Sequence, residues 1–312
     1  TAQALLATMA GFSAVYHGPE GIRTIAKRIH NIAAYLEKEI SKLGYKQVNV
    51  QYFDTLRFAL PDNVSAQQVR TVALSKEVNL RYFKNGDVGM SIDETTDLAA
   101  VNVLLSIFGI AAGKDYTKTT DIPESCTIQQ PFRRQSTYLT HEVFNRYHTE
   151  TEMMRYIKRL DRKDISLAHS MISLGSCTMK LNAAAEMLPL SRPEFMNMHP
   201  LVPEEQAEGY RELIHNLSEE LKVITGFAGV SLQPNSGAAG EYAGLRVIRA
   251  YLENIGQGHR NKVLIPASAH GTNPASAVQA GFTTVTCACD EQGNVDMADL
   301  RAKAEENKDD LA

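Results

Sequence analysis

The sequence predicts an α/β fold in which a small α+β domain precedes a mostly parallel sheet. Two patterns lead to this prediction. Residues 1–116 read helix, helix, strand, strand, helix, strand, strand, helix, the order of a compact α+β domain. Residues 173–312 alternate strands and helices, which is typical of parallel strands joined by crossover helices. Residues 117–172 hold prolines and one charged helix, and they read as a connector.

Length and composition narrow the class of protein. A chain of 312 residues is long enough for about two domains, and 44% hydrophobic with 22% charged residues excludes a disordered chain. The net charge of −4 offers no basic surface to nucleic acid or anionic lipid. No apolar run approaches the roughly 18 residues of a membrane-spanning helix. We therefore expect no nucleic-acid partner and no membrane partner.

The four cysteines indicate a reducing compartment. They are Cys126, Cys177, Cys287 and Cys289, and none forms the CxxC pair typical of a zinc or disulfide site. The chain lacks an initiator methionine, and both of its ends read as helix interiors. We therefore expect an internal piece of a longer protein.

In the first part, helical periodicity predicts helices over 4–15 and 22–40. Gly18-Pro19 restarts the chain between these helices, and Gly44 ends the second one. The remaining predicted elements are strands at 48–53 and 56–60, a helix at 65–74 capped by Ser65, a hairpin of 78–83 and 88–92 around Asn85-Gly86-Asp87, and a helix at 97–110. This part shows no nucleophile, metal motif or phosphate loop.

The later parts alternate more regularly. The connector carries a predicted helix at 151–160, with Thr149 and Glu152 in the spacing of a capping box. The third part has predicted helices at 205–224, 241–255, 275–280 and 297–312, and predicted strands at 229–232, 262–266 and 283–289. Ligands bind such sheets at the loops that leave the carboxyl ends of strands. Residues 233–240 and 267–274 are two loops of this kind.

Loop 233–240 reads Gln-Pro-Asn-Ser-Gly-Ala-Ala-Gly and leads into a helix. Small residues let the backbone approach a ligand, and the free amides and dipole of a helix N-terminus favour an anion such as phosphate. The loop matches neither the dinucleotide nor the triphosphate fingerprint. A tight turn in which Ser236 simply caps the helix explains the same residues equally well.

Loop 267–274 contains His270 between small hydrogen-bonding residues, and Pro274 follows at the start of a helix. An imidazole at the ligand edge of a sheet can stack on an aromatic ligand. An exposed polar side chain is the alternative. Residues 173–182 gather Cys177, Lys180 and several hydroxyl groups. A buried, inert cysteine is the favoured interpretation there, and Lys180 is either a surface lysine or a partner for a substrate carboxylate.

Four segments together resemble the P-protein family of the glycine cleavage system, the enzymes that decarboxylate glycine with pyridoxal 5′-phosphate (PLP). They are residues 144–151 (Phe-Asn-Arg-Tyr-His-Thr-Glu-Thr), 174–182, 233–245 and 269–277, and residues 1–20 are also similar. The resemblance extends over essentially the whole chain.

The resemblance implies two homologous halves of the aspartate-aminotransferase type, of which the second binds PLP. Residues 1–116 would be the small C-terminal domain of the first half, and residues 173–312 the N-terminal portion of the PLP-binding large domain. No lysine of this chain matches the His-Lys motif in which the family holds PLP, so the catalytic residue is unknown and the chain alone is expected to be inactive. Lys262, Lys303 and Lys308 lack surroundings that would lower an amine pKa.

The resemblance also implies site residues and partners. Residues assigned to PLP are Ser236, Gly237 and Ala238 at the phosphate, His270 on the ring, and Thr272 and Asn273 at its polar edge. Residues assigned to the substrate or carrier entrance are Ser176, Thr178, Lys180 and Asn182. Glycine would be the substrate and lipoylated H-protein the aminomethyl acceptor, in a homodimer located in the bacterial cytoplasm or the mitochondrial matrix. Another PLP enzyme of the same fold, or a non-catalytic anion-binding or assembly module, is the alternative.

Overall fold

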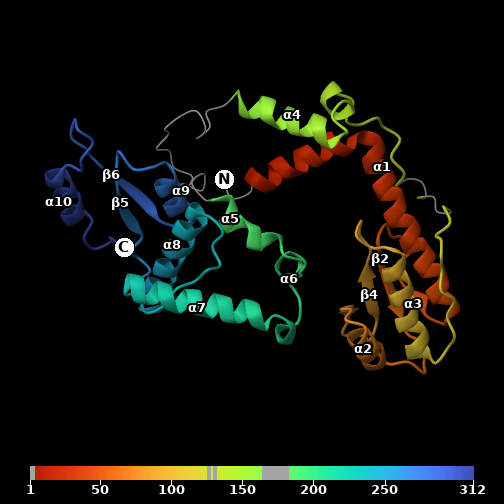
Figure 1. Cartoon of the computed structure of the whole chain (residues 1–312). Helices are drawn as coiled ribbons and strands as arrows, with labels where there is room; N and C mark the ends of the chain where they lie inside the picture. Colours follow the sequence, from red (N-terminus) through yellow and green to blue (C-terminus); the bar gives the residue numbers. More distant parts are fainter. Residues whose placement is uncertain (1–3, 125–127, 129–131, 164–182) are drawn as a thin grey trace. The chain divides into compact units, whose positions relative to one another are not determined.

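The computed structural model describes residues 4–124, 128, 132–163 and 183–312 (Figure 1). They divide into a first unit within residues 6–171 and a second unit made mainly of residues 172–312. Each unit combines helices with a small sheet, which confirms the predicted mixed α/β class. In the part of the chain that is described, no helix is long and apolar enough to cross a bilayer.

The first unit is built on a four-stranded antiparallel sheet of order β1-β2-β4-β3. Its elements are α1 (Ala4–Lys42), β1 (Lys46–Gln47), β2 (Thr55–Ala59), α2 (Ala66–Ser75), β3 (Arg81–Tyr82), β4 (Val88–Ser91), α3 (Leu98–Ala112), the 3₁₀ turn η1 (Glu142–Asn145) and α4 (Glu150–Asp161). Leu56 pairs with Met90 and Phe58 with Val88, so four buried side chains share one face of the sheet. The predicted strand at 56–60 and the predicted hairpin are confirmed.

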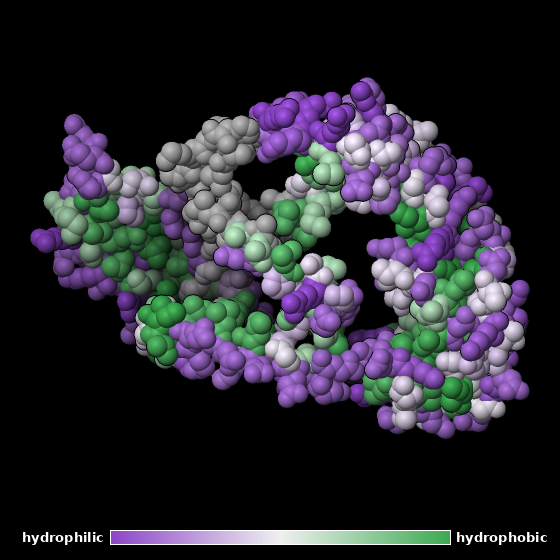
Figure 2. Space-filling view, in the orientation of Figure 1, coloured by the Kyte–Doolittle hydropathy of each residue, from purple (hydrophilic) through white to green (hydrophobic). Residues whose placement is uncertain are grey.

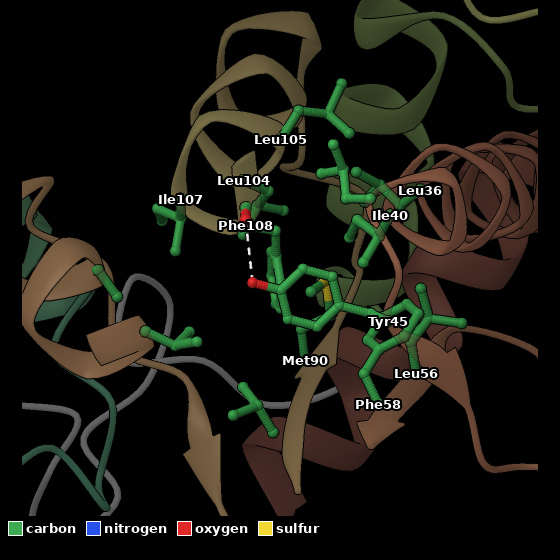
Figure 3. Packing of buried hydrophobic residues seen from close by; sticks show 14 of the residues in the cluster. Leu36, Ile40, Tyr45, Leu56, Phe58, Met90, Leu104, Leu105, Ile107 and Phe108 are labelled. Carbon is green, nitrogen blue, oxygen red and sulfur yellow. Dashed lines mark hydrogen bonds between the residues drawn. The ribbon is translucent and has the colours of Figure 1, made fainter. Parts of the chain in front are cut away.

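The core of the first unit lies between this sheet, α1 and α3 (Figure 3). Leu36 and Ile40 of α1 and Phe108 of α3 are fully buried in it. The ring of Tyr45 packs edge-on against Phe108, and its hydroxyl donates a 2.9 Å hydrogen bond to the Phe108 carbonyl oxygen. Burial raises the pKa of the Tyr45 hydroxyl from its ordinary 10.0 to about 12, because the phenolate would lose its hydration.

Helix α1 bends at Gly18, as the sequence predicts. Gly18 has φ 61° and ψ −176°, a backbone conformation that is essentially restricted to glycine. Pro19 follows and has no N–H to continue the helical bonds. Two side chains from the segment predicted as a connector bind the backbone at the bend: the ring nitrogen Nδ1 of His148 lies 2.7 Å from the Tyr16 oxygen, and Tyr138 donates to the Pro19 oxygen at 2.7 Å.

The bend is reinforced by a second apolar cluster within the same unit. Val15, Tyr147 and Met153 are its buried members, so part of the predicted connector packs directly on α1. Thr149 caps α4 by accepting from the Glu152 N–H at 3.3 Å, and Ser65 forms a complete capping box with Gln68 at the start of α2. Both predicted caps are confirmed. The division of the chain at residues 116 and 172 stays a prediction.

The predicted strand at 48–53 is wrong. Strand β1 is shorter and earlier, because the side-chain oxygen of Gln47 accepts hydrogen bonds from the Val48 and Arg57 N–H groups, each at 3.0 Å. One backbone bond persists at Val48, whose N–H also donates to the Arg57 oxygen at 2.8 Å, but the Arg57 N–H binds the Gln47 side chain in place of a backbone oxygen. Val50, at the middle of the predicted strand, is 97% exposed.

The second unit contains a β–α–β motif. Its elements are α5 (Ala184–Met187), η3 (Leu188–Ser191), α6 (Pro193–Met196), η4 (Glu204–Gln206), α7 (Glu208–Thr225), α8 (Gly237–Asn254), β5 (Lys262–Pro266), α9 (Thr272–Gln279), β6 (Thr283–Cys287) and α10 (Met297–Glu306). β5 and β6 are parallel, as predicted, with Lys262 opposite Thr283. Leu252 of α8 packs with Ala277 of α9, with Ala280 directly after α9, and with Phe282.

Two predicted elements of this unit differ from the structure. Residues 229–232 do not form a strand, since none of the described residues pairs with them. The predicted helix 297–312 ends at Glu306, and the chain then returns to the sheet. There Leu311 forms a parallel bridge with Lys262, whose N–H donates to the Asp310 oxygen at 3.0 Å.

An ion pair on α10 holds this helix to β6. The ammonium of Lys303 lies 2.8 Å from the Asp299 carboxylate and also donates to the Thr286 oxygen. Asp299 in turn accepts the Ala288 N–H at 2.7 Å. The hydrogen bond from Lys303 is the largest cause that lowers the pKa of Asp299, and the same bond raises the pKa of Lys303.

Apolar side chains remain exposed around the C-terminal end of α7, where Figure 2 shows an apolar surface. Val223, Ile224 and Phe227 are between 68% and 85% exposed in this region. The helix buries little of its own apolar face against the described residues of its unit.

We expect Gly18→Ala to lower the free energy of unfolding of the first unit by about 3 kcal/mol, the cost of a non-glycine residue in this conformation. The new Cβ would also lie 2.6 Å from the Phe144 oxygen and 2.7 Å from His148 Cε1. Gly11→Ala is the matched control, because a Cβ at Gly11 meets no atom within 4 Å and alanine favours a helix by up to about 1 kcal/mol. Urea unfolding measures both changes, and equal effects would contradict the role of Gly18.

We expect the stability of the first unit to fall between about pH 10 and pH 12 through Tyr45. Its folded-state pKa is raised, so its contribution is complete below the unfolded value and is lost as the pH rises through the folded value. Tyr45→Phe should cost about 1 kcal/mol at neutral pH and remove this part of the alkaline decline. Urea midpoints measured across this range, with the exposed Tyr16→Phe as control, test the assignment; parallel profiles for wild type and Tyr45→Phe would contradict it.

Candidate functional site

The candidate site begins at the N-terminus of α8. Ser236 is extended, with φ −159° and ψ 164°, and its hydroxyl oxygen accepts the Ala239 N–H at 3.1 Å. The N–H groups of Gly237 and Ala238 lie in the first turn and have no partner within the helix. A Cβ on Gly237 would meet no atom within 4 Å, so the space in front of this turn is open. The predicted cap is therefore present, and the proton of the Ser236 hydroxyl is still available to a ligand.

His270 lies in the loop that leaves the carboxyl end of β5. The loop turns tightly, since the Ala269 N–H bonds the Pro266 oxygen and the Asn273 N–H bonds the His270 oxygen. The imidazole is exposed. Its Nδ1 lies 2.9 Å from the Thr272 hydroxyl oxygen and 3.2 Å from the Thr272 backbone nitrogen. The ring is thus anchored to the first residue of α9 through one nitrogen.

Glu241 of α8 joins the two loops. Its Oε1 accepts from the Thr272 hydroxyl and its Oε2 from the Ser276 hydroxyl, each at 3.2 Å. Glu241 is half-buried and Ser276 is buried. No ion pair of Glu241 occurs within the described ranges, so its recorded partners are two neutral hydroxyl groups.

This network brings the two predicted loops to the same end of the α8–α9 pair. Glu241 lies five residues after Ser236, which is about 7 Å along the axis at 1.5 Å per residue. From there a single hydrogen bond reaches Thr272, two residues beyond His270. The hydrogen bonds of Glu241 therefore connect the helix that begins after Ser236 with the helix that follows His270.

The roles assigned to the predicted site residues all stay predictions. Ser176, Thr178, Lys180 and Asn182, the predicted entrance residues, lie outside the described residues, and so does Cys177.

The sequence reasoning did not single out Glu241 or Ser276. The spacing of Thr272 and Ser276 could have indicated it. Residues four apart lie on the same face of a helix, so one polar side chain can bind both hydroxyls.

Each described lysine of the second unit forms an ion pair with a carboxylate. Asp299 raises the pKa of Lys303, and Lys262 lies 3.2 Å from the Asp310 carboxylate. A lysine that attacks a carbonyl must be a neutral amine, and the raised pKa of Lys303 disfavours that form. Within the described part of the chain, no three His, Cys, Asp or Glu side chains converge where they could hold a metal ion.

The chain is similar to proteins that carry one name. Residues 1–108 match the family model described as glycine cleavage system P-protein. All 312 residues align at 84% identity with glycine dehydrogenase (decarboxylating) of Bacteroides fragilis strain YCH46. The chain is a homologue of glycine dehydrogenase (decarboxylating). The enzymes of this name from Bacteroides thetaiotaomicron and Shewanella amazonensis are 82% and 55% identical, again over the whole chain.

The chain spans about one third of the length of these curated relatives: 33% for the two Bacteroides enzymes and 32% for the Shewanella enzyme. The match of residues 1–108 and the 84% identity confirm the resemblance to the P-protein family. The prediction of a homologue of glycine dehydrogenase that spans part of its length is confirmed as well.

Proposed function

We propose that this chain forms part of a PLP-dependent glycine decarboxylase that transfers the remaining aminomethyl group to the lipoyl group of H-protein. One observation supports this most strongly: 84% identity over all 312 residues to an enzyme named glycine dehydrogenase (decarboxylating). We further propose the aspartate-aminotransferase type of fold, with residues 1–116 as the small domain of one half and residues 173–312 as the start of the PLP-binding domain of the next.

The start of α8 fits the phosphate of PLP. The N–H groups of Gly237 and Ala238 and the hydroxyl of Ser236 are three donors at the positive end of an 18-residue helix. The open space at Gly237 leaves room for a phosphate to approach the backbone. His270, held by Thr272, supplies a flat ring for the pyridine face, and Asn273 would lie at its polar edge.

The chemistry divides between cofactor and protein. PLP, when bound, withdraws electrons from the bond that breaks at the substrate carbon. Ser236, Gly237 and Ala238 would fix its phosphate, and His270 would fix the plane of its ring. Ser176, Thr178, Lys180 and Asn182 would line the entrance for glycine or for the lipoyl arm. The cofactor lysine would lie outside this chain.

We propose a homodimer for the whole enzyme. Because the relatives described above come from bacteria, we also propose a cytoplasmic location.

We expect a chain extended to the length of the relatives to release CO2 from glycine when PLP and lipoylated H-protein are both present. Alanine in place of glycine is the substrate control. The same chain should bind PLP with a visible absorption band, since a lysine would then be available to hold it. An extended chain that binds phosphate but neither absorbs in the visible range nor releases CO2 would instead support an anion-binding module. Release of CO2 from alanine would support another PLP enzyme of this fold.

We expect Ser236→Ala to weaken binding of PLP to the 312-residue chain about tenfold, because it removes one donor to a charged phosphate. Ser231→Ala is the matched control, since Ser231 is an exposed serine shortly before α8. Equilibrium dialysis measures both affinities, and inorganic phosphate should compete with PLP. Equal affinities of the two variants would contradict the phosphate site.

A further inference from the structure

The hydrogen bonds around Thr272 constrain where its single hydroxyl proton can be. A carboxylate only accepts, so each hydroxyl bound to Glu241 must direct its proton at an Oε atom. Thr272 lies 3.2 Å from Oε1 and Ser276 lies 3.2 Å from Oε2. Hydrogen bonds to a charged acceptor are about twice as strong as neutral ones. The Thr272 proton therefore points to Glu241, and only lone pairs of its oxygen face His270.

This arrangement decides which nitrogen of His270 carries the proton. Nδ1 lies 2.9 Å from the Thr272 oxygen, and that oxygen has no proton left to donate to it. The contact is a hydrogen bond only if Nδ1 is protonated and donates. The longer 3.2 Å contact from the Thr272 N–H favours the opposite state, because it needs a lone pair on Nδ1. The two contacts compete, and the carboxylate selects between them.

We propose that Glu241 is a positioning residue that holds neutral His270 as the Nδ1–H tautomer, acting through the Thr272 hydroxyl. The outer nitrogen Nε2 is then an acceptor, and the imidazole receives an N–H or O–H donor from the ligand instead of offering one. Without the carboxylate, the Thr272 hydroxyl turns and donates to Nδ1 together with the Thr272 N–H. The imidazole then carries its proton on Nε2.

The functional consequence rests on the proposed function: in a glycine decarboxylase, the acceptor nitrogen suits the amino group of an amino-acid substrate. The tautomer itself is a property of this chain without cofactor. The tautomer proposal can therefore fail while PLP binding is observed. PLP binding can likewise fail while the tautomer is as proposed.

The test is the tautomer of His270 in the 312-residue chain without PLP, read from the nitrogen-15 shifts of the imidazole. The measurement is made at about pH 8.5, and the shifts of both ring nitrogens together report the neutral tautomer. His270→Asn identifies the signal among the nine histidines. We expect Nδ1–H in the wild type, and a shift of most of the population to Nε2–H in Glu241→Leu.

Matched variants separate this role from general loss of structure. Glu241→Gln keeps an oxygen that accepts from Thr272, and Ser276→Ala keeps the carboxylate; both should retain Nδ1–H. Thr272→Val should lose the Nδ1–H tautomer, whereas Thr272→Ser should retain it. These two Thr272 variants test the proposal if Glu241→Leu does not fold. The proposal is overturned if the wild type shows Nε2–H, if Glu241→Leu or Thr272→Val retains Nδ1–H, or if Glu241→Gln behaves like Glu241→Leu.

Discussion

The arrangement of the candidate site depends on one carboxylate that accepts two hydrogen bonds. The carboxylate of Glu241 binds two hydroxyls of α9 from a position on α8, so it connects the helix that starts at Ser236 with the helix that follows His270. Apolar packing of Leu252 against Ala277 joins the same two helices. Two directional bonds to one carboxylate fix their relative position, and they also orient the imidazole. Glu241 thus connects the two loops, while backbone hydrogen bonds and the Ser236 cap shape each of them.

Much of the fold was readable from local sequence signals. Ser65 and Thr149 cap helices because their side-chain oxygens satisfy N–H groups of the first turn, and this needs only residues three positions apart. The bend at Gly18 follows from the glycine and Pro19. The predictions that failed needed partners far along the chain. Residues 229–232 carry a strand pattern without a strand beside them, and the pairing predicted for 48–53 stops after Val48, where the Arg57 N–H binds the Gln47 side chain.

The site was predictable in part. The small residues from Ser236 and the position of His270 after a strand indicate a ligand edge, because the rule for parallel sheets depends only on strand order. Glu241 was missed because a single acid within a helix has no sequence feature that separates it from a solvent-exposed one. Its role depends on α9 lying alongside α8, and that is a tertiary contact. The entrance residues 176–182 stay predictions.

The ion pair of α10 has a consequence for how the sheet ends. Within the described residues, β6 pairs with β5 on one side only, so the outward-facing groups of its other side include the Thr286 oxygen and the Ala288 N–H. Lys303 takes up the first group and Asp299 the second. An incoming β-strand would have to displace both charged side chains, together with their mutual attraction, before it could extend the ladder.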